Sequence, residues 1–165
     1  MKKSGERKYA ALLAAILSCA LAPPAAAQAA AQPIVRAVDL RSEARAAHDA
    51  GGPLVIFFSE PGCPYCARAR RDHLAPLAID PGSRGRFSLV EIDIRSPSPL
   101  LDFSGLRSTH AAFAAQSAIK WVPTLVFVDA GGKALAEPLV GLTVPDLYGG
   151  QLERRLEQAA AKLRR

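Results

Sequence analysis

Residues 54–58 form a continuous apolar run that no polar residue interrupts. A run of this kind is typical of a strand that a sheet buries on both faces. Apolar and polar residues alternate at 87–94, which predicts a second strand. Three other segments that are rich in apolar residues predict further strands, at 34–38, 123–128 and 133–140. The turn residues 129–132 separate the last two strands and predict an antiparallel hairpin.

Four helices are expected around these strands. Asp39 favours the N-terminal cap of the first helix, and Gly51-Gly52 ends that helix. The predicted helices cover residues 39–50, 63–74, 108–118 and 146–163. Pro76 should end or kink the second helix, and residues 96–104 are expected to form a loop. Because strands and helices alternate before the hairpin, we predict an α/β domain with a central mixed sheet and helices on both faces.

The first 29 residues have the pattern of a secretory signal peptide. Basic residues precede an apolar stretch, and small residues with an Ala-x-Ala cleavage pattern follow it, ending at Ala27 or Ala29. The apolar stretch is too short to span a membrane. We therefore predict a signal peptide at 1–29 and one domain at 30–165. Lipid anchoring at Cys19 is the weaker alternative, because the residues before Cys19 match a lipidation motif only imperfectly.

The charge distribution argues against nucleic acid as a partner. The formal net charge is +6, and part of it belongs to the predicted signal peptide. The remaining basic residues are scattered among acids, and no basic stripe is interleaved with aromatic residues. A nucleic-acid-binding surface would need such a stripe. No second apolar run is long enough to cross a membrane, so we expect no transmembrane span in the mature chain.

Two cysteines follow the apolar run of the buried strand. The sequence Cys63-Pro64-Tyr65-Cys66 begins the next predicted helix, and Pro64 at the first helical position makes Cys63 the N-terminal cap. The unpaired N–H groups and the helix dipole at this end stabilise a thiolate on Cys63. Cys66 lies one turn further on the same face, where it can attack a mixed disulfide formed at Cys63. This pattern predicts disulfide exchange, with Cys63 as the nucleophile and Cys66 as the resolving thiol.

A lone pair of cysteines has other uses, which the sequence favours less. A zinc site would need further ligands, and His48, His73 and His110 lack ligand spacing, so each is expected to be a packing or surface residue. Covalent haem attachment needs a histidine where Ala67 stands. A disulfide that closes so short a loop would add little stability. Two alternative functions remain: a chaperone that binds copper or zinc, and an interaction module with incidental cysteines.

Together with these cysteines, several segments make the chain resemble the thioredoxin superfamily. One of them is Trp121-Val122-Pro123-Thr124, directly before a predicted strand. The turn at 131–133 and the closing helix complete the resemblance, which covers essentially the whole chain after the signal. The start of the closing helix, Tyr148-Gly149-Gly150, makes the chain most similar to exported bacterial thioredoxin-like proteins. That group includes proteins of sulfur oxidation and of cytochrome c maturation. The resemblance implies a thioredoxin fold.

The resemblance also implies a site and a function. Pro123 should be a cis-proline beside the cysteine pair, and Val122 should offer its backbone N–H and C=O to an extended substrate. The residues expected to bind substrate are Pro64, Tyr65, Trp121, Val122 and Pro123. The implied activity is disulfide reduction in the periplasm, with oxidase or isomerase activity as alternatives. It would need no cofactor besides the Cys63–Cys66 disulfide.

The partners implied by the resemblance are exported proteins that carry disulfides, together with a membrane thiol electron donor. The chain is expected to be a monomer. Two features depart from the thioredoxin pattern. Thioredoxin has a buried acid on the strand before its cysteines, whereas the equivalent position here is Ile56 or Phe57, both apolar. The acids that could replace it are Glu60, Glu91 and Asp93. Residues 96–108 are also longer than thioredoxin needs, and the sequence assigns them no function.

Overall fold

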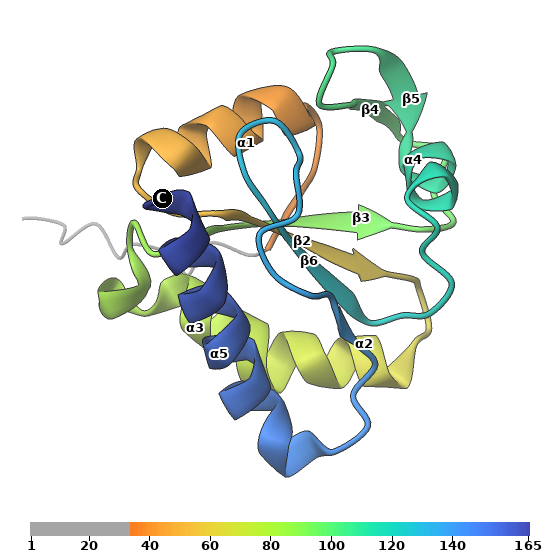
Figure 1. Cartoon of the computed structure of the whole chain (residues 1–165). Coiled ribbons are helices and arrows are strands. Elements are labelled where there is room, and N and C mark those ends of the chain that lie inside the picture. The colour runs from red at the N-terminus through yellow and green to blue at the C-terminus, as the bar shows by residue number, and fades with distance from the viewer. Residues whose placement is uncertain (1–33) are drawn as a thin grey trace, which may run out of the picture.

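The structure of the protein is a computed structural model, and it describes residues 34–165 (Figure 1). The predicted signal peptide, its cleavage site and Cys19 lie outside the described residues, so these remain predictions. Within residues 34–165, no helix has both the length and the apolar character needed to cross a membrane.

The helices and strands follow the predicted alternation, with one addition. In chain order they are β1 (Val35–Arg36), α1 (Leu40–Asp49), β2 (Leu54–Ser59), α2 (Pro64–Ala69), the π-helix η1 (Arg70–Leu74), α3 (Ala75–Ile79), the 3-10 helix η2 (Pro81–Ser83), β3 (Ser88–Asp93), β4 (Pro99–Leu101), β5 (Arg107–Thr109), α4 (His110–Gln116), β6 (Thr124–Val128), β7 (Leu139–Val140) and α5 (Pro145–Leu163). The addition is the pair β4–β5, which forms a separate two-stranded sheet.

The main sheet is mixed and has β2 at its centre. Its five strands lie in the order β1-β3-β2-β6-β7, with β1, β3 and β2 parallel and β6 and β7 antiparallel to their neighbours. Every residue of β2 is buried, as the continuous apolar run predicted. Alternate residues of a strand point to opposite faces, so β2 contributes to two cores. One core contains Val55 and Phe57, and the other contains Leu54, Ile56 and Phe58.

Helices cover both faces of this sheet (Figure 1). The core around Phe57 receives Cys66 and Ala69 from α2 and Tyr148 and Leu152 from α5. The opposite core receives side chains from α1 and α4, which are Leu40, Ala44, Ala47, Phe113 and Ala114. The predicted central mixed sheet with helices on both faces is therefore confirmed.

The helix that begins with the cysteines is longer than predicted. Instead of ending near residue 74, it passes through η1 and continues as α3 to Ile79. Pro76 lies in the first turn of α3 and has no N–H to donate to the preceding turn. The wider π turn of η1 directly before it lets the chain stay helical through this position.

Residues 96–104 do not form a simple loop, which corrects the prediction. Pro99–Leu101 pairs with Arg107–Thr109 as an antiparallel hairpin, and Thr109 caps α4, so the helix begins slightly later than the predicted range 108–118. A backbone hydrogen bond connects the hairpin to the segment before α1, since the Leu101 N–H donates to the Val38 carbonyl at 2.9 Å. The predicted strand at 133–140 is also shorter, since only Leu139–Val140 pairs with β6, apart from a single bridge at Ala134.

The start of α4 is fixed by the buried side chain of His110. Its Nδ1 accepts a hydrogen bond from the Asp93 N–H at 3.1 Å, and its Nε2 lies 2.8 Å from the Ala37 carbonyl. Both contacts are satisfied together when the proton is on Nε2. His110 thereby connects α4 to the end of β3 and to the segment between β1 and α1.

Candidate active site

The two cysteines are joined by a disulfide at the beginning of α2. Their Cα atoms lie 5.2 Å apart. Cys63 is the N-terminal cap and its Sγ accepts the Cys66 N–H at 3.0 Å, with Pro64 in the first turn, as the sequence predicted. Gly62 has a φ of +76°, a conformation that favours glycine, and it turns the chain from β2 into the helix.

The two sulfurs differ in their access to solvent. Cys63 is half-buried, whereas Cys66 is only 2% exposed and belongs to the core around Phe57. A partner can therefore reach Cys63 more readily than Cys66. The unpaired N–H groups of the helix start also point at Cys63, and they stabilise negative charge on its sulfur.

Pro123 lies at the same end of the sheet as the cysteines. The Val122–Pro123 bond is cis, which confirms what the resemblance implied. Thr124 pairs with Phe58 across the antiparallel strands β6 and β2, so Pro123 lies beside the carboxyl end of β2. The chain runs from that end of β2 to Cys63. The Gly141 N–H donates to the Pro123 carbonyl at 2.7 Å and fixes the loop after β7 against this segment.

The other residues expected to bind substrate differ in exposure. Tyr65 and Trp121 present large side chains to solvent, with 61% and 72% of their surface exposed, and Pro64 is exposed as well. Val122 is half-buried and Pro123 is buried. The exposed side chains come from the two segments that carry the cysteines and the cis-proline, so they can form one contact surface.

The three candidate acids occupy different environments. Glu60 is paired on the surface with Arg95, whose Nε lies 2.6 Å from the carboxylate. Asp93 accepts the Arg95 N–H at 3.0 Å and lies 3.8 Å from the Arg36 guanidinium. Glu91 is different because its carboxylate is enclosed beneath α2 by two side chains that the sequence analysis did not identify, Ser59 and Arg70.

The surroundings of Glu91 favour its ionised form. Burial alone would raise the pKa of Glu91, but the hydrogen bonds from Arg70 and Ser59, together with the charge of Arg70, outweigh burial and lower it. The signal that could have revealed Arg70 is its position four residues after Cys66, on the same side of the helix. Its partner Glu91 could not be chosen from the sequence, because the pairing depends on the register of β2 with β3.

Metal coordination has no further support from the structure. Between residues 34 and 165, no group of three or more histidine, cysteine, aspartate or glutamate side chains could hold a metal ion. Two cysteines alone would leave a zinc ion short of its usual four ligands.

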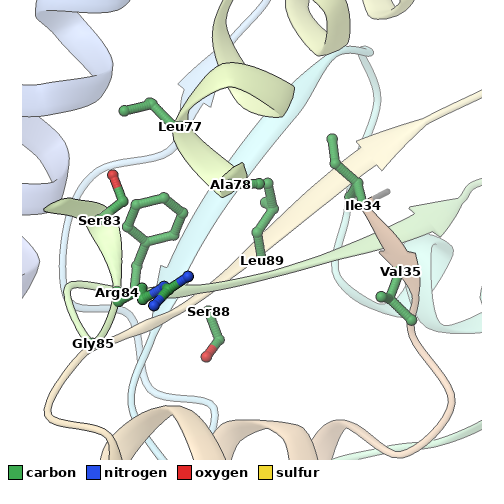
Figure 2. A pocket seen from close by; sticks show the side chains of 10 residues that line it. Ile34, Val35, Leu77, Ala78, Ser83, Arg84, Gly85, Ser88 and Leu89 are labelled. Carbon is green, nitrogen blue, oxygen red and sulfur yellow. The ribbon is translucent and has the colours of Figure 1, made fainter. Parts of the chain in front are cut away.

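A separate pocket lies at the other end of the sheet (Figure 2). Its lining includes Ile34 and Val35 from the start of β1, Leu77 from α3 and Leu89 near the start of β3. The cysteines instead follow the carboxyl end of β2. This pocket therefore does not belong to the candidate active site.

Comparisons with known proteins agree with this geometry. Residues 40–159 match a family model described as a thioredoxin-like domain. Mitochondrial thioredoxin 3 from Saccharomyces cerevisiae, in its oxidized form, is 18% identical with a TM-score of 0.50, and the match covers 75% of this chain and 93% of that chain. Thioredoxin from Trichomonas vaginalis is 17% identical with a TM-score of 0.48, covering 76% of this chain and 96% of that chain. No curated protein matches the sequence.

Proposed function

The chain belongs to the thioredoxin-like family, and from that premise we propose that it is an exported thiol–disulfide oxidoreductase that reduces disulfides in periplasmic partner proteins. The observation that carries the proposal is the Cys63–Cys66 disulfide at the start of α2, with one accessible and one buried sulfur. Export is supported by the signal pattern of residues 1–29.

In the proposed reaction, the reduced pair transfers two electrons to the partner. The Cys63 thiolate attacks one sulfur of the partner's disulfide, and the other partner sulfur leaves as a thiolate and takes up a proton. Cys66 then loses its proton and attacks Cys63 Sγ, which releases the second partner sulfur and forms the Cys63–Cys66 disulfide. A membrane thiol donor, proposed from the family resemblance, would reduce this disulfide again.

Substrate contact is proposed at the surface formed by Tyr65, Trp121 and Val122. The backbone of Val122 would pair with an extended segment of the partner, as in strand addition, and bring the partner's disulfide to Cys63. The two exposed aromatic rings would cover apolar residues that flank the disulfide.

Replacing Trp121 by Ala is expected to weaken the reduction of protein disulfides without weakening the fold. The ring is largely exposed, so the free energy of unfolding should change by less than about 0.5 kcal/mol. Loss of a buried aromatic contact with the partner should lower kcat/KM for a protein substrate about tenfold. Ellman's reagent, a small aromatic disulfide that is too short to reach the ring, is the control substrate. Equal losses for both substrates would contradict a role in partner binding.

The direction of electron flow can be tested by the reduction potential of the pair. The helix start stabilises the Cys63 thiolate and makes the pair more oxidising, but Tyr65 stands where strongly oxidising exported enzymes have a histidine. We therefore expect a potential nearer about −270 mV, typical of thioredoxin, than about −120 mV, typical of a strong oxidant. Equilibration with glutathione buffers, followed by thiol alkylation and mass spectrometry, measures it. A pair that stays fully reduced in a buffer near about −180 mV would identify an oxidant instead.

A further inference from the structure

A pocket of about 350 Å³ lies at the end of the sheet opposite the cysteines (Figure 2). In Figure 2, Ile34 and Val35 lie on one side of the pocket, Ser83 and Arg84 lie on the other, and Leu89 lies between them. The volume is within the range of pockets that bind small molecules in proteins. The pocket takes no part in the proposed disulfide exchange, so a ligand bound there would serve a separate purpose.

The pocket lies where the pairing at the edge of the sheet is incomplete. All six residues of β3 pair with β2, whereas β1 pairs with only two of them, Val90 and Glu91. Within residues 34–165, Ser88 and Leu89 therefore have no strand beside them on the outer side, and both line the pocket. Pro33, which precedes the described residues, has no N–H with which to extend the ladder. The sheet is thus open at this place.

Half-buried apolar side chains form the inner side of the pocket. They pack against the core that contains Phe57, and they are Ile34, Leu77, Phe87 and Leu89. Phe87 and Leu89 are two residues apart at the start of β3, so they extend to the same face of the sheet. The surface that these side chains do not bury in the core is open to the pocket. An apolar ligand would remove this surface from water, which favours binding.

A narrow gap lies behind these side chains. It is too small to hold water and is lined only by apolar residues, which are Val55, Leu74, Leu77, Phe87, Leu89, Leu152 and Leu156. Side chains that border such a gap lack contacts on one side, so they have room to shift when a ligand enters the pocket. A polar group could not enter the gap without losing its hydrogen bonds. The apolar part of a ligand must therefore face inward, and its polar group must stay at the rim.

The rim of the pocket carries the cationic side chain of Arg84. Arg84 is exposed, and none of the ion pairs within residues 34–165 includes it. The neighbouring charges are engaged elsewhere, since Arg86 pairs with Glu153 and the Asp80 carboxylate accepts the Ser83 hydroxyl at 3.2 Å. No acidic residue is among the described residues that line the pocket. A carboxylate at the rim would therefore meet a guanidinium, its preferred partner, and no opposing acid.

We propose that this pocket binds a small amphipathic carboxylate, such as a medium-chain fatty acid. The carboxylate pairs with the Arg84 guanidinium at the rim, and the alkyl chain covers Leu77, Phe87 and Leu89. A neutral alcohol of the same length keeps the second contact and loses the first. A peptide strand fits less well, because only two residues of β3 are open to pair with it.

Titration of the ¹⁵N-labelled mature protein with octanoate, followed by NMR, locates the site and measures its affinity. The amide signals of Ala78, Ser88 and Leu89 should shift, whereas those of Cys63 and Trp121, at the other end of the sheet, should not. The expected dissociation constant for octanoate is on the order of 0.1–1 mM. Hexanoate is two CH₂ groups shorter and should bind about fifteenfold more weakly, since each buried CH₂ group strengthens binding about fourfold.

Two variants separate the charge of the pocket from its apolar surface. Arg84→Gln should weaken octanoate binding about threefold or more and leave the affinity for octanol, which carries no charge, within about twofold. The matched control is Arg86→Gln, which removes the same charge outside the pocket and should leave both affinities unchanged. Ala78→Phe fills the pocket from an exposed position of α3 and should abolish binding of both ligands. Ala161→Phe, at an exposed position of α5, should not.

Shifts confined to the pocket, with a loss of affinity in Arg84→Gln for octanoate but not for octanol, support the proposal. It is overturned if octanoate causes no shifts, as it would if residues before Ile34 filled the pocket. It is also overturned if the shifts spread over the whole surface, as with a detergent, or if Arg84→Gln weakens both ligands equally or neither. Urea unfolding establishes that each variant is folded. If Ala78→Phe does not fold, Arg84→Gln and Arg86→Gln decide alone, because both change exposed side chains.

Discussion

Replacing Cys63 by Ser is expected to abolish disulfide reduction, whereas Cys66→Ser should attack its partner and fail to release it. Cys63 is the accessible sulfur and receives the unpaired N–H groups of the helix start, so its thiolate is the reactive species. A serine hydroxyl at this position is not ionised near neutral pH and cannot replace it. Because Cys66 is buried behind Cys63, it cannot begin the reaction in the variant that lacks Cys63.

The activity of Cys63→Ser is measured as the rate of insulin reduction in the presence of dithiothreitol. This rate should fall to the rate observed without the protein. Mass spectrometry of the second variant after incubation with partners should show mixed disulfides at Cys63. The matched control is Ala67→Ser, an exposed position next to the pair, which should retain activity. Faster alkylation of Cys66 than of Cys63 in the reduced protein at neutral pH would contradict the assignment.

Cys66→Ala in the native host extends the same argument to the unknown partners. A variant that cannot resolve should accumulate covalent complexes, and the proteins bound to Cys63 would be the natural substrates. This variant removes the second thiol and leaves the helix start intact, since the Cys63 cap depends on the backbone N–H of residue 66.

The parts of the fold that local sequence determines were predictable. A short apolar run without polar residues is typical of a strand buried on both faces, and β2 is the buried central strand. The cap at Cys63 follows from Pro64 at the first helical position. The cis bond before Pro123 was implied by the resemblance, since spacing alone does not distinguish a cis from a trans proline.

Features that depend on long-range contacts were not predictable. Residues 96–104 contain two prolines and read as a loop, but Leu100 enters the core beside α1 and the hairpin forms around it. In the same way, three acids were equally plausible near Cys66. The register of β3 against β2 places Glu91 beside Phe57. Arg70, from the helix that follows the cysteines, donates hydrogen bonds to the Glu91 carboxylate.

Replacing Phe57 by Ala is expected to cause a large loss of stability. Phe57 is fully buried in the central strand, with Leu125 and Glu91 as its neighbours in register. Removing its ring leaves a cavity in the core beneath Cys66, and a change of this kind costs about 3–5 kcal/mol. A domain of this size has a free energy of unfolding of about 5–15 kcal/mol, so the variant should unfold at a much lower urea concentration.

Urea denaturation followed by circular dichroism measures this loss, and Phe57→Leu and Trp121→Ala provide the comparison. Leucine refills part of the cavity, so Phe57→Leu should lose less stability than the alanine variant. Trp121→Ala removes a larger ring from an exposed position and should change stability by less than about 0.5 kcal/mol. The loss of stability in Phe57→Ala should also exceed what the lost burial of apolar surface alone would cause. The Arg70 guanidinium packs over the Phe57 ring and loses this contact in the variant. A loss below about 1 kcal/mol would mean that the core beneath Cys66 is not closely packed.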